Sequence, residues 1–277
     1  MTATASRDDA HGLRGALNDM LWLLPVPLFL IVLSRVGVRM TDPAFIGMVA
    51  GLALFMSVGI WLRSVVRRRI FLAGAVREQS FWYRRLRGGV LMALTSLLAG
   101  LPLATILVVA AVRAPGPELL IGMILNLPVF VLLREFWHRR LAAHAVPRFR
   151  AMLALRLALA VNLGLLFFAL AVAALFRTYP EFSGLTLVEA MLSEAGRQEA
   201  SSGLLQGLMQ LAAAKDAAAW WLGQQVLPGV IEPGLQVTGW MILLATDVLV
   251  VWSYLLVCAS VLTLVHWRAW HPGGRSE

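Results

Sequence analysis

The chain has 277 residues, of which 60% are apolar and only 14% are charged. Soluble domains have about 45–50% apolar and about 25% charged residues. A water-soluble fold of this length cannot bury so much apolar side chain, so the composition excludes a soluble globular protein. The mean hydropathy of +0.78 and the clustering of apolar residues into blocks indicate a polytopic membrane protein.

Six apolar blocks are long enough, or nearly so, to cross a hydrocarbon core, which requires about 20 residues of helix. In chain order they cover residues 20–38, 43–62, 89–112, 118–137, 152–176 and 237–265. The first block contains Pro25 and Pro27 and ends near Arg35, so a re-entrant segment is the alternative to a full span there. We expect an all-α membrane helix bundle with about six transmembrane helices, five of them within residues 20–176.

The basic residues are distributed unevenly over the segments between these blocks. Residues 1–19, 63–88, 134–151 and 266–277, together with Arg156, hold 18 of the 24 basic residues. Because short loops rich in Arg and Lys stay in the cytoplasm, these segments are predicted to be cytoplasmic. The pattern predicts a bacterial-type inner-membrane protein with both termini in the cytoplasm.

Residues 177–236 form the only sizeable region outside the expected spans, and we expect them on the outer face between the fifth and sixth helices. Apolar residues recur there at helical spacing, which predicts two amphipathic helices with a break near residues 201–203. Trp220 and Trp221 belong to an apolar stretch and are predicted to contact the outer leaflet. The segment is either a lid over an opening between the two spans or a cap that stabilises the bundle.

Asp247 lies about ten residues into the block 237–265, close to the middle of the membrane at the usual helical rise. A charge at that depth costs about 3 kcal/mol. The functional hypotheses are a proton or cation relay and a contact with another subunit; the structural one is a hydrogen bond to Asn126, Asn162 or Thr246. Asp247, Asn126 and Asn162 form the candidate intramembrane polar site. The proline two residues after Asn126 frees a helical carbonyl from its hydrogen bond. This turn is therefore a candidate to line a pathway through the bundle.

Aromatic and basic side chains alternate in the predicted cytoplasmic segment 63–88. This candidate surface consists of Arg67, Arg68, Arg69, Trp82, Arg84, Arg85 and Arg87. Amphipathic segments that lie on anionic lipid headgroups are built in this way. The two neighbouring spans favour lipid, so we expect no nucleic-acid binding. A docking site for a soluble protein is the remaining alternative.

Gly47, Gly51 and Gly59 form a stripe of small residues on the second expected span. Such a stripe lets another helix approach closely. The pattern favours packing against the first or third span of the same chain, with oligomerisation as the alternative.

The sequence carries no His-Glu-x-x-His zinc motif and no Gly-x-Ser-x-Gly elbow, and no glycine precedes its single lysine, Lys215, as a phosphate-binding loop requires. We therefore expect neither an enzyme nor a bound cofactor or metal. The favoured hypothesis is a non-catalytic subunit of a transport, secretion or conjugation assembly. Its partners would be other membrane or cytoplasmic subunits.

Two alternatives remain open. In layout the chain resembles the permease subunit of ABC-2 type exporters, which implies six spans, cytoplasmic termini, short helices between the last two spans and a separate ATPase. The second alternative is an oligomeric ion channel, which the long link before the last span favours, although no recognisable filter sequence is present.

Overall fold

The computed structural model describes residues 15–75, 90–113, 117–175, 180–225 and 232–266. These residues form helices and short connections, without strands. Helices long and apolar enough to cross a membrane cover Gly15–Arg39, Asp42–Val65, Val90–Val112, Leu120–Ala143, Phe149–Ala173 and Val248–Val265. The expected all-α membrane bundle with six transmembrane helices is therefore confirmed.

The first span is a full-length helix and not a re-entrant segment. Its first turns lead into α2 (Pro25–Val36), which is followed by the 3-10 turn η1 (Gly37–Arg39). The backbone N–H of Leu24 donates to the Met20 carbonyl at 3.1 Å, so the helical hydrogen bonds reach the first proline. Proline is tolerated in the first turn of a helix, and Pro25 takes that position in α2.

Several of the following helices continue beyond the apolar blocks. They are α3 (Asp42–Ala75), α5 (Val90–Val112), α6 (Pro117–Arg140) and α7 (Pro147–Leu175), with the 3-10 turn η2 (Leu141–Ala143) after α6. Much of the expected loops 63–88 and 134–151 is therefore helical, and residues 76–89 lie outside the described part. Arginine is a good helix former, so a helix need not end where its apolar residues end.

The last apolar block is broken in two. Helix α10 (Pro233–Leu244) is followed by the 3-10 turn η4 (Ala245–Asp247) and by α11 (Val248–Val265). The expected continuous helix over 237–265 is not observed. With 18 residues, α11 is about 27 Å long at the usual helical rise, which nearly matches a hydrocarbon core of about 30 Å. The span therefore does not need α10, and Asp247 precedes it.

Helix α11 lies at the centre of the bundle. Of the residues in its 18-residue apolar window, 61% are buried, against 28–44% in the windows of the other spans. It packs on α3, α5 and α7. The hydroxyls of Ser253, Ser260 and Thr263 donate to carbonyls four residues earlier in α11, so these buried groups are satisfied within their own helix. Gly59 of α3 lets Ser260 approach, since a Cβ at Gly59 would overlap its side chain. Small-residue packing within the chain thus occurs at Gly59, against the last span instead of the first or third.

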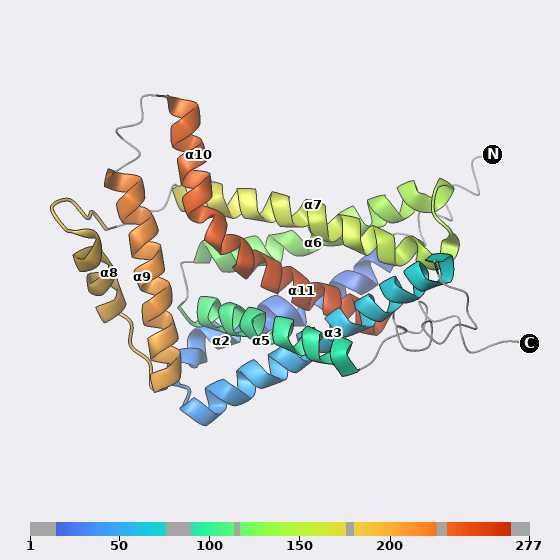
Figure 1. Ribbon diagram of the computed structural model, residues 1–277, viewed down its shortest axis with the longest axis horizontal. Helices are drawn as coiled ribbons and strands as arrows, with labels where there is room; N and C mark the ends of the chain where they lie inside the picture. Colours follow the sequence, from blue (N-terminus) through green and yellow to red (C-terminus); the bar gives the residue numbers. More distant parts are fainter. Residues whose placement is uncertain (1–14, 76–89, 114–116, 176–179, 226–231, 267–277) are drawn as a thin grey trace, which may run out of the picture.

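The two ends of the bundle differ in what covers them. Figure 1 shows the spanning helices side by side, with α8 (Leu187–Gly196) and α9 (Gly203–Gln225) across one end and α10 turned away from the direction of α11. We call this the α9 end. At the opposite, arginine-rich end, Asp19 of the first span contacts His266 after α11 at 2.6 Å. The described chain therefore begins and finishes on the same face.

Candidate functional site at the α9 end

The segment between the fifth and sixth spans folds into two helices that are separated where the sequence predicts the break. At the start of α8, Thr186 and Glu189 form a capping box: the Thr186 N–H donates to the Glu189 carboxylate at 2.8 Å, and Thr186 Oγ1 accepts from the Glu189 N–H at 3.3 Å. At the start of α9, Ser202 Oγ accepts from the Leu205 N–H at 3.1 Å. Each helix thus has a side-chain cap at its first turn.

The first attachment of α9 to the bundle is made by Asp42, at the start of α3. The Ser202 hydroxyl donates to the Asp42 carboxylate, which also accepts from the Leu204 N–H at 3.2 Å. The N–H of Ser201 donates to the Val38 carbonyl at 2.9 Å. A carboxylate at a helix N-terminus meets unpaired N–H groups and the positive end of the helix dipole. The N-terminus of α9 is thereby fastened to the connection between the first two spans.

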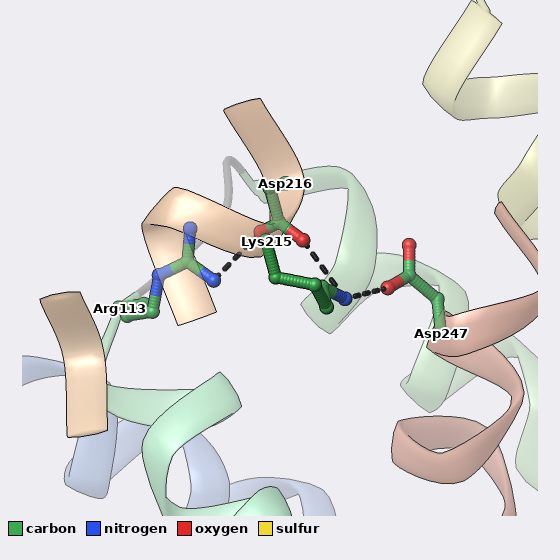
Figure 2. A network of polar contacts seen from close by, with 4 residues as sticks. All are labelled: Arg113, Lys215, Asp216 and Asp247. Atoms are coloured by element: carbon green, nitrogen blue, oxygen red, sulfur yellow. Dashed lines mark hydrogen bonds and ion pairs between the residues drawn. The ribbon is translucent and has the colours of Figure 1, made fainter. Parts of the chain in front are cut away.

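The second attachment is a row of alternating charges (Figure 2). Arg113 follows α5 and pairs with Asp216 of α9 at 2.7 Å. The other oxygen of Asp216 accepts from Lys215 at 2.9 Å, and Lys215 also reaches Asp247 at 3.0 Å. Two cations and two anions therefore join α5, α9 and the turn that precedes α11.

The charge states follow from these contacts. Burial raises the pKa of Asp247 above its usual value, and the Lys215 ammonium opposes that rise. Burial lowers the pKa of Lys215, but the carboxylates of Asp216 and Asp247 outweigh this effect and raise it overall. Lys215 is thus held charged, with 42% of its side chain exposed, next to an Asp247 side chain that is 51% exposed. The expectation of a midplane Asp247 is wrong, because the residue lies at the break before α11 and pairs with Lys215.

The third attachment involves the two tryptophans of α9. Trp220 packs against Trp240 of α10 with ring centroids 4.6 Å apart and ring planes tilted by 48°, and the Trp221 indole N–H donates to the Leu185 carbonyl at 2.8 Å. Gly223 leaves room for Trp240, since a Cβ there would overlap its ring. Both tryptophans are half-buried in contacts within the chain, and their predicted contact with the outer leaflet stays a prediction.

Asn126 and Asn162 lie in the bundle interior and do not pair with Asp247. They are 5% and 0% exposed. The Tyr254 hydroxyl donates to the Met123 carbonyl at 2.7 Å and lies within hydrogen-bond reach of the Asn126 side chain. Asn126 Nδ2 and both polar atoms of Asn162 have no hydrogen-bond partner among the described residues. The Tyr254 side chain therefore packs against the Asn126 turn, which the sequence suggested as part of a pathway through the bundle.

The arginine-rich candidate surface is described in part. Arg67 and Arg68 are exposed on the extension of α3 beyond the span. The Arg69 backbone belongs to the same helix, while its side chain and Trp82, Arg84, Arg85 and Arg87 lie outside the described residues. Their lipid or partner contact stays a prediction.

A second charged cluster, at the arginine-rich end, was not expected from the sequence. Arg134 of α6 pairs with Asp19 of the first span, whose other carboxylate oxygen contacts His266. Burial, and then the positive charge of Arg134, lower the pKa of His266, so its ring is neutral at pH 7. The partners are 115 and 247 residues apart in the sequence, so no local pattern connects them.

At both ends of the bundle, the charged contacts join helices to one another. The described residues hold no group of three or more His, Cys, Asp or Glu side chains that could bind a metal ion. In comparisons with known proteins, no protein-family model, curated protein or solved structure matches this chain. The most developed polar site of the described chain is the set of contacts that holds α9 across the end of a packed bundle.

Proposed function

We propose that this chain is a non-catalytic, multi-pass subunit of a transport, secretion or conjugation assembly in a bacterial-type inner membrane. The observation that carries the proposal is a packed bundle centre beneath a helical layer fastened across one end. The positive-inside rule supports a cytoplasmic position for the arginine-rich end. The α8 and α9 helices would then lie on the extracytoplasmic side.

Large side chains fill the middle of the bundle. Leu107, Met123, Phe130, Tyr254 and Leu255 are each at most 1% exposed and come from α5, α6 and α11. Interiors of this kind are close-packed and leave few voids larger than a water molecule. A conducting path would therefore have to form between this chain and other subunits, which favours a subunit over a self-sufficient transporter.

Both ends offer surfaces for partners. At the α9 end, Val188 and Leu192 are 62% and 67% exposed and lie one turn apart on α8. At the arginine-rich end, the extension of α3 carries exposed Arg67 and Arg68, which suit anionic lipid headgroups or an acidic protein surface. These surfaces support a role in holding other subunits on both sides of the membrane.

Reconstitution tests the proposal. The purified full-length chain in liposomes should give no ion flux above that of protein-free liposomes, because its centre is filled. In native membranes, cross-linking from a photoreactive residue at Val188 or Arg68 should join it to other proteins at a fixed ratio. Ion flux through the purified chain alone would contradict the proposal and favour the channel.

The second candidate is a permease subunit driven by a separate ATPase. Three features favour it: the six spans, the position of both described ends of the chain on the same face of the bundle, and the helices α8, α9 and α10 before the last span. A neighbouring ATPase gene, together with ATP hydrolysis that co-purifies with the chain and falls in the Arg67→Ala, Arg68→Ala variant, would favour this candidate over a scaffold subunit.

A further inference from the structure

A groove of about 390 Å³ opens between α2 and α3 at membrane depth. Its walls include Pro25 and Phe29 of α2 and Gly47 and Gly51 of α3, and its floor includes Leu107 of α5 and Val257 of α11. All of these residues belong to spanning helices. The groove therefore opens toward hydrocarbon and not toward water.

The groove exists because α2 and α3 diverge. Although η1 joins them directly, each packs chiefly on its other neighbours: α2 on α5 and α6, and α3 on α5 and α11. Gly37, the first residue of η1, is pressed against α5, where a Cβ would overlap Val112. The connection is thus held on α5, and the two helices spread apart from it.

The glycines of the groove are not explained by packing within the chain. A Cβ at Gly47 or Gly51 would meet no atom within 4 Å, whereas a Cβ at Gly59 or Gly100 would overlap a neighbouring serine. Glycine destabilises a helix relative to alanine, so nothing in the described chain accounts for glycine at positions 47 and 51. What the two glycines do is keep the groove wide.

We propose that the groove binds one acyl chain of an anionic phospholipid from the leaflet at the α9 end. The named wall and floor residues are apolar or glycine, as an acyl chain requires. Arg35, in the last turn of α2, and Arg39, in η1, are exposed at the α9 end of the two helices that form the groove, on the membrane surface where a lipid phosphate would lie. Cationic side chains at the membrane surface attract anionic headgroups.

Chain width and charge favour a lipid as the occupant of the groove. A single hydrocarbon chain is about 4 Å wide at van der Waals contact and fits between α2 and α3. The positive charge of Arg35 and Arg39 favours an anionic lipid over the apolar span of a second copy.

Photolabelling of the full chain in nanodiscs tests the proposal. The nanodiscs contain phosphatidylethanolamine and phosphatidylglycerol whose acyl chain carries a diazirine, and labelled peptides are identified by mass spectrometry. In the wild type, label should concentrate on peptides that contain Phe29 and Phe55. Gly47→Leu or Gly51→Leu places a side chain in the groove from a position where the Cβ meets no atom, and should reduce this label to the level of lipid-exposed α7. Gly164→Leu, on α7 with no atom near its Cβ, is the matched control and should leave it unchanged.

Arg39→Gln tests the headgroup contact. It should lower the preference of the site for phosphatidylglycerol over phosphatidylethanolamine about fivefold. The proposal is overturned if label is spread equally over all spanning helices, or if Gly51→Leu and Gly164→Leu behave alike. It is also overturned if Gly51→Leu turns an oligomer into a monomer in native mass spectrometry without loss of lipid, since the occupant would then be a second copy.

Discussion

The charged clusters at the two ends of the bundle use similar residues but differ in burial. At the arginine-rich end, the side chains of Asp19 and Arg134 are 8% and 16% exposed. At the α9 end, those of Lys215 and Asp247 are 42% and 51% exposed. Removing one partner of a buried pair leaves an uncompensated charge and costs about 3–5 kcal/mol, whereas an exposed pair contributes about 0–1 kcal/mol.

Because of this difference in burial, the two clusters stabilise the structure to different extents. The buried cluster joins the first, fourth and last spans, which lie far apart in the sequence, and so it locks the bundle. The α9 layer is held by several contacts that are individually weak. A partner that binds at the α9 end could shift α9 at small cost while the spans stay in place.

The largest effect is expected for Asp19→Ala, which leaves Arg134 buried without its carboxylate. The free energy of unfolding, measured in mixed detergent micelles, should fall by about 3 kcal/mol or more. The double variant Asp19→Leu, Arg134→Met removes both charges and should recover most of this loss. A loss below about 1 kcal/mol in Asp19→Ala would mean that the cluster behaves like an exposed pair, and would contradict the difference between the two ends of the bundle.

Asp42→Ala should have the next largest effect, because it removes the acceptor at the start of α9. We expect a lower thermal stability and faster amide hydrogen exchange in the first turn of α9. Asp42→Asn keeps one acceptor oxygen and should show a smaller change. Unaltered exchange at Leu204 and Leu205 in Asp42→Ala would contradict the attachment.

Within the row of charges, Asp216→Asn should cost more stability than Asp247→Asn. Asp216 pairs with both Arg113 and Lys215, whereas Asp247 pairs with Lys215 and has its pKa raised by burial. The expected losses are about 1 and about 0.5 kcal/mol, and both should shrink at high salt. The reverse order would show that Asp247 is the main anchor of Lys215.

The smallest effect concerns pH at the arginine-rich end. The pKa of His266 in the folded protein lies below its usual value of 6.5, so the unfolded chain binds its proton first as pH falls. This contribution to stability is present above pH 6.5 and is lost as the pH falls through the lowered pKa. Stability should therefore fall less steeply between pH 7 and pH 5 in His266→Gln than in the wild type. Exposed His144→Gln is the control, and parallel curves for all three proteins would exclude the effect.

The spans could be predicted from the sequence because lipid imposes a simple requirement, about 20 apolar residues in a helix. The position of Asp247 could not be predicted from hydropathy, because the apolar residues of α10 join those of α11 without a gap. Hydropathy does not distinguish a helix that spans from one that turns away just before it. The break between α8 and α9 was predictable, since small polar residues interrupt the periodicity there.

The contacts that hold α9 were not predictable in the same way. Lys215 and Asp216 were visible as charges in an apolar stretch, but their partners Arg113 and Asp247 come from other helices. Asp19 reads as an ordinary polar residue before a span, and only the folded bundle brings it to Arg134. Such pairings depend on how helices are arranged, which the apolar pattern of a single chain leaves open.

The most direct test of the account is the side of the membrane on which each end lies. In a Cys258→Ala background, which removes the buried native thiol, Ser183→Cys probes the α9 end and His144→Cys the arginine-rich end. A membrane-impermeant maleimide added to intact spheroplasts should label Ser183→Cys, and should label His144→Cys only after the membrane is permeabilised. Labelling of His144→Cys in intact spheroplasts, with Ser183→Cys protected, would contradict the orientation on which the proposed function depends.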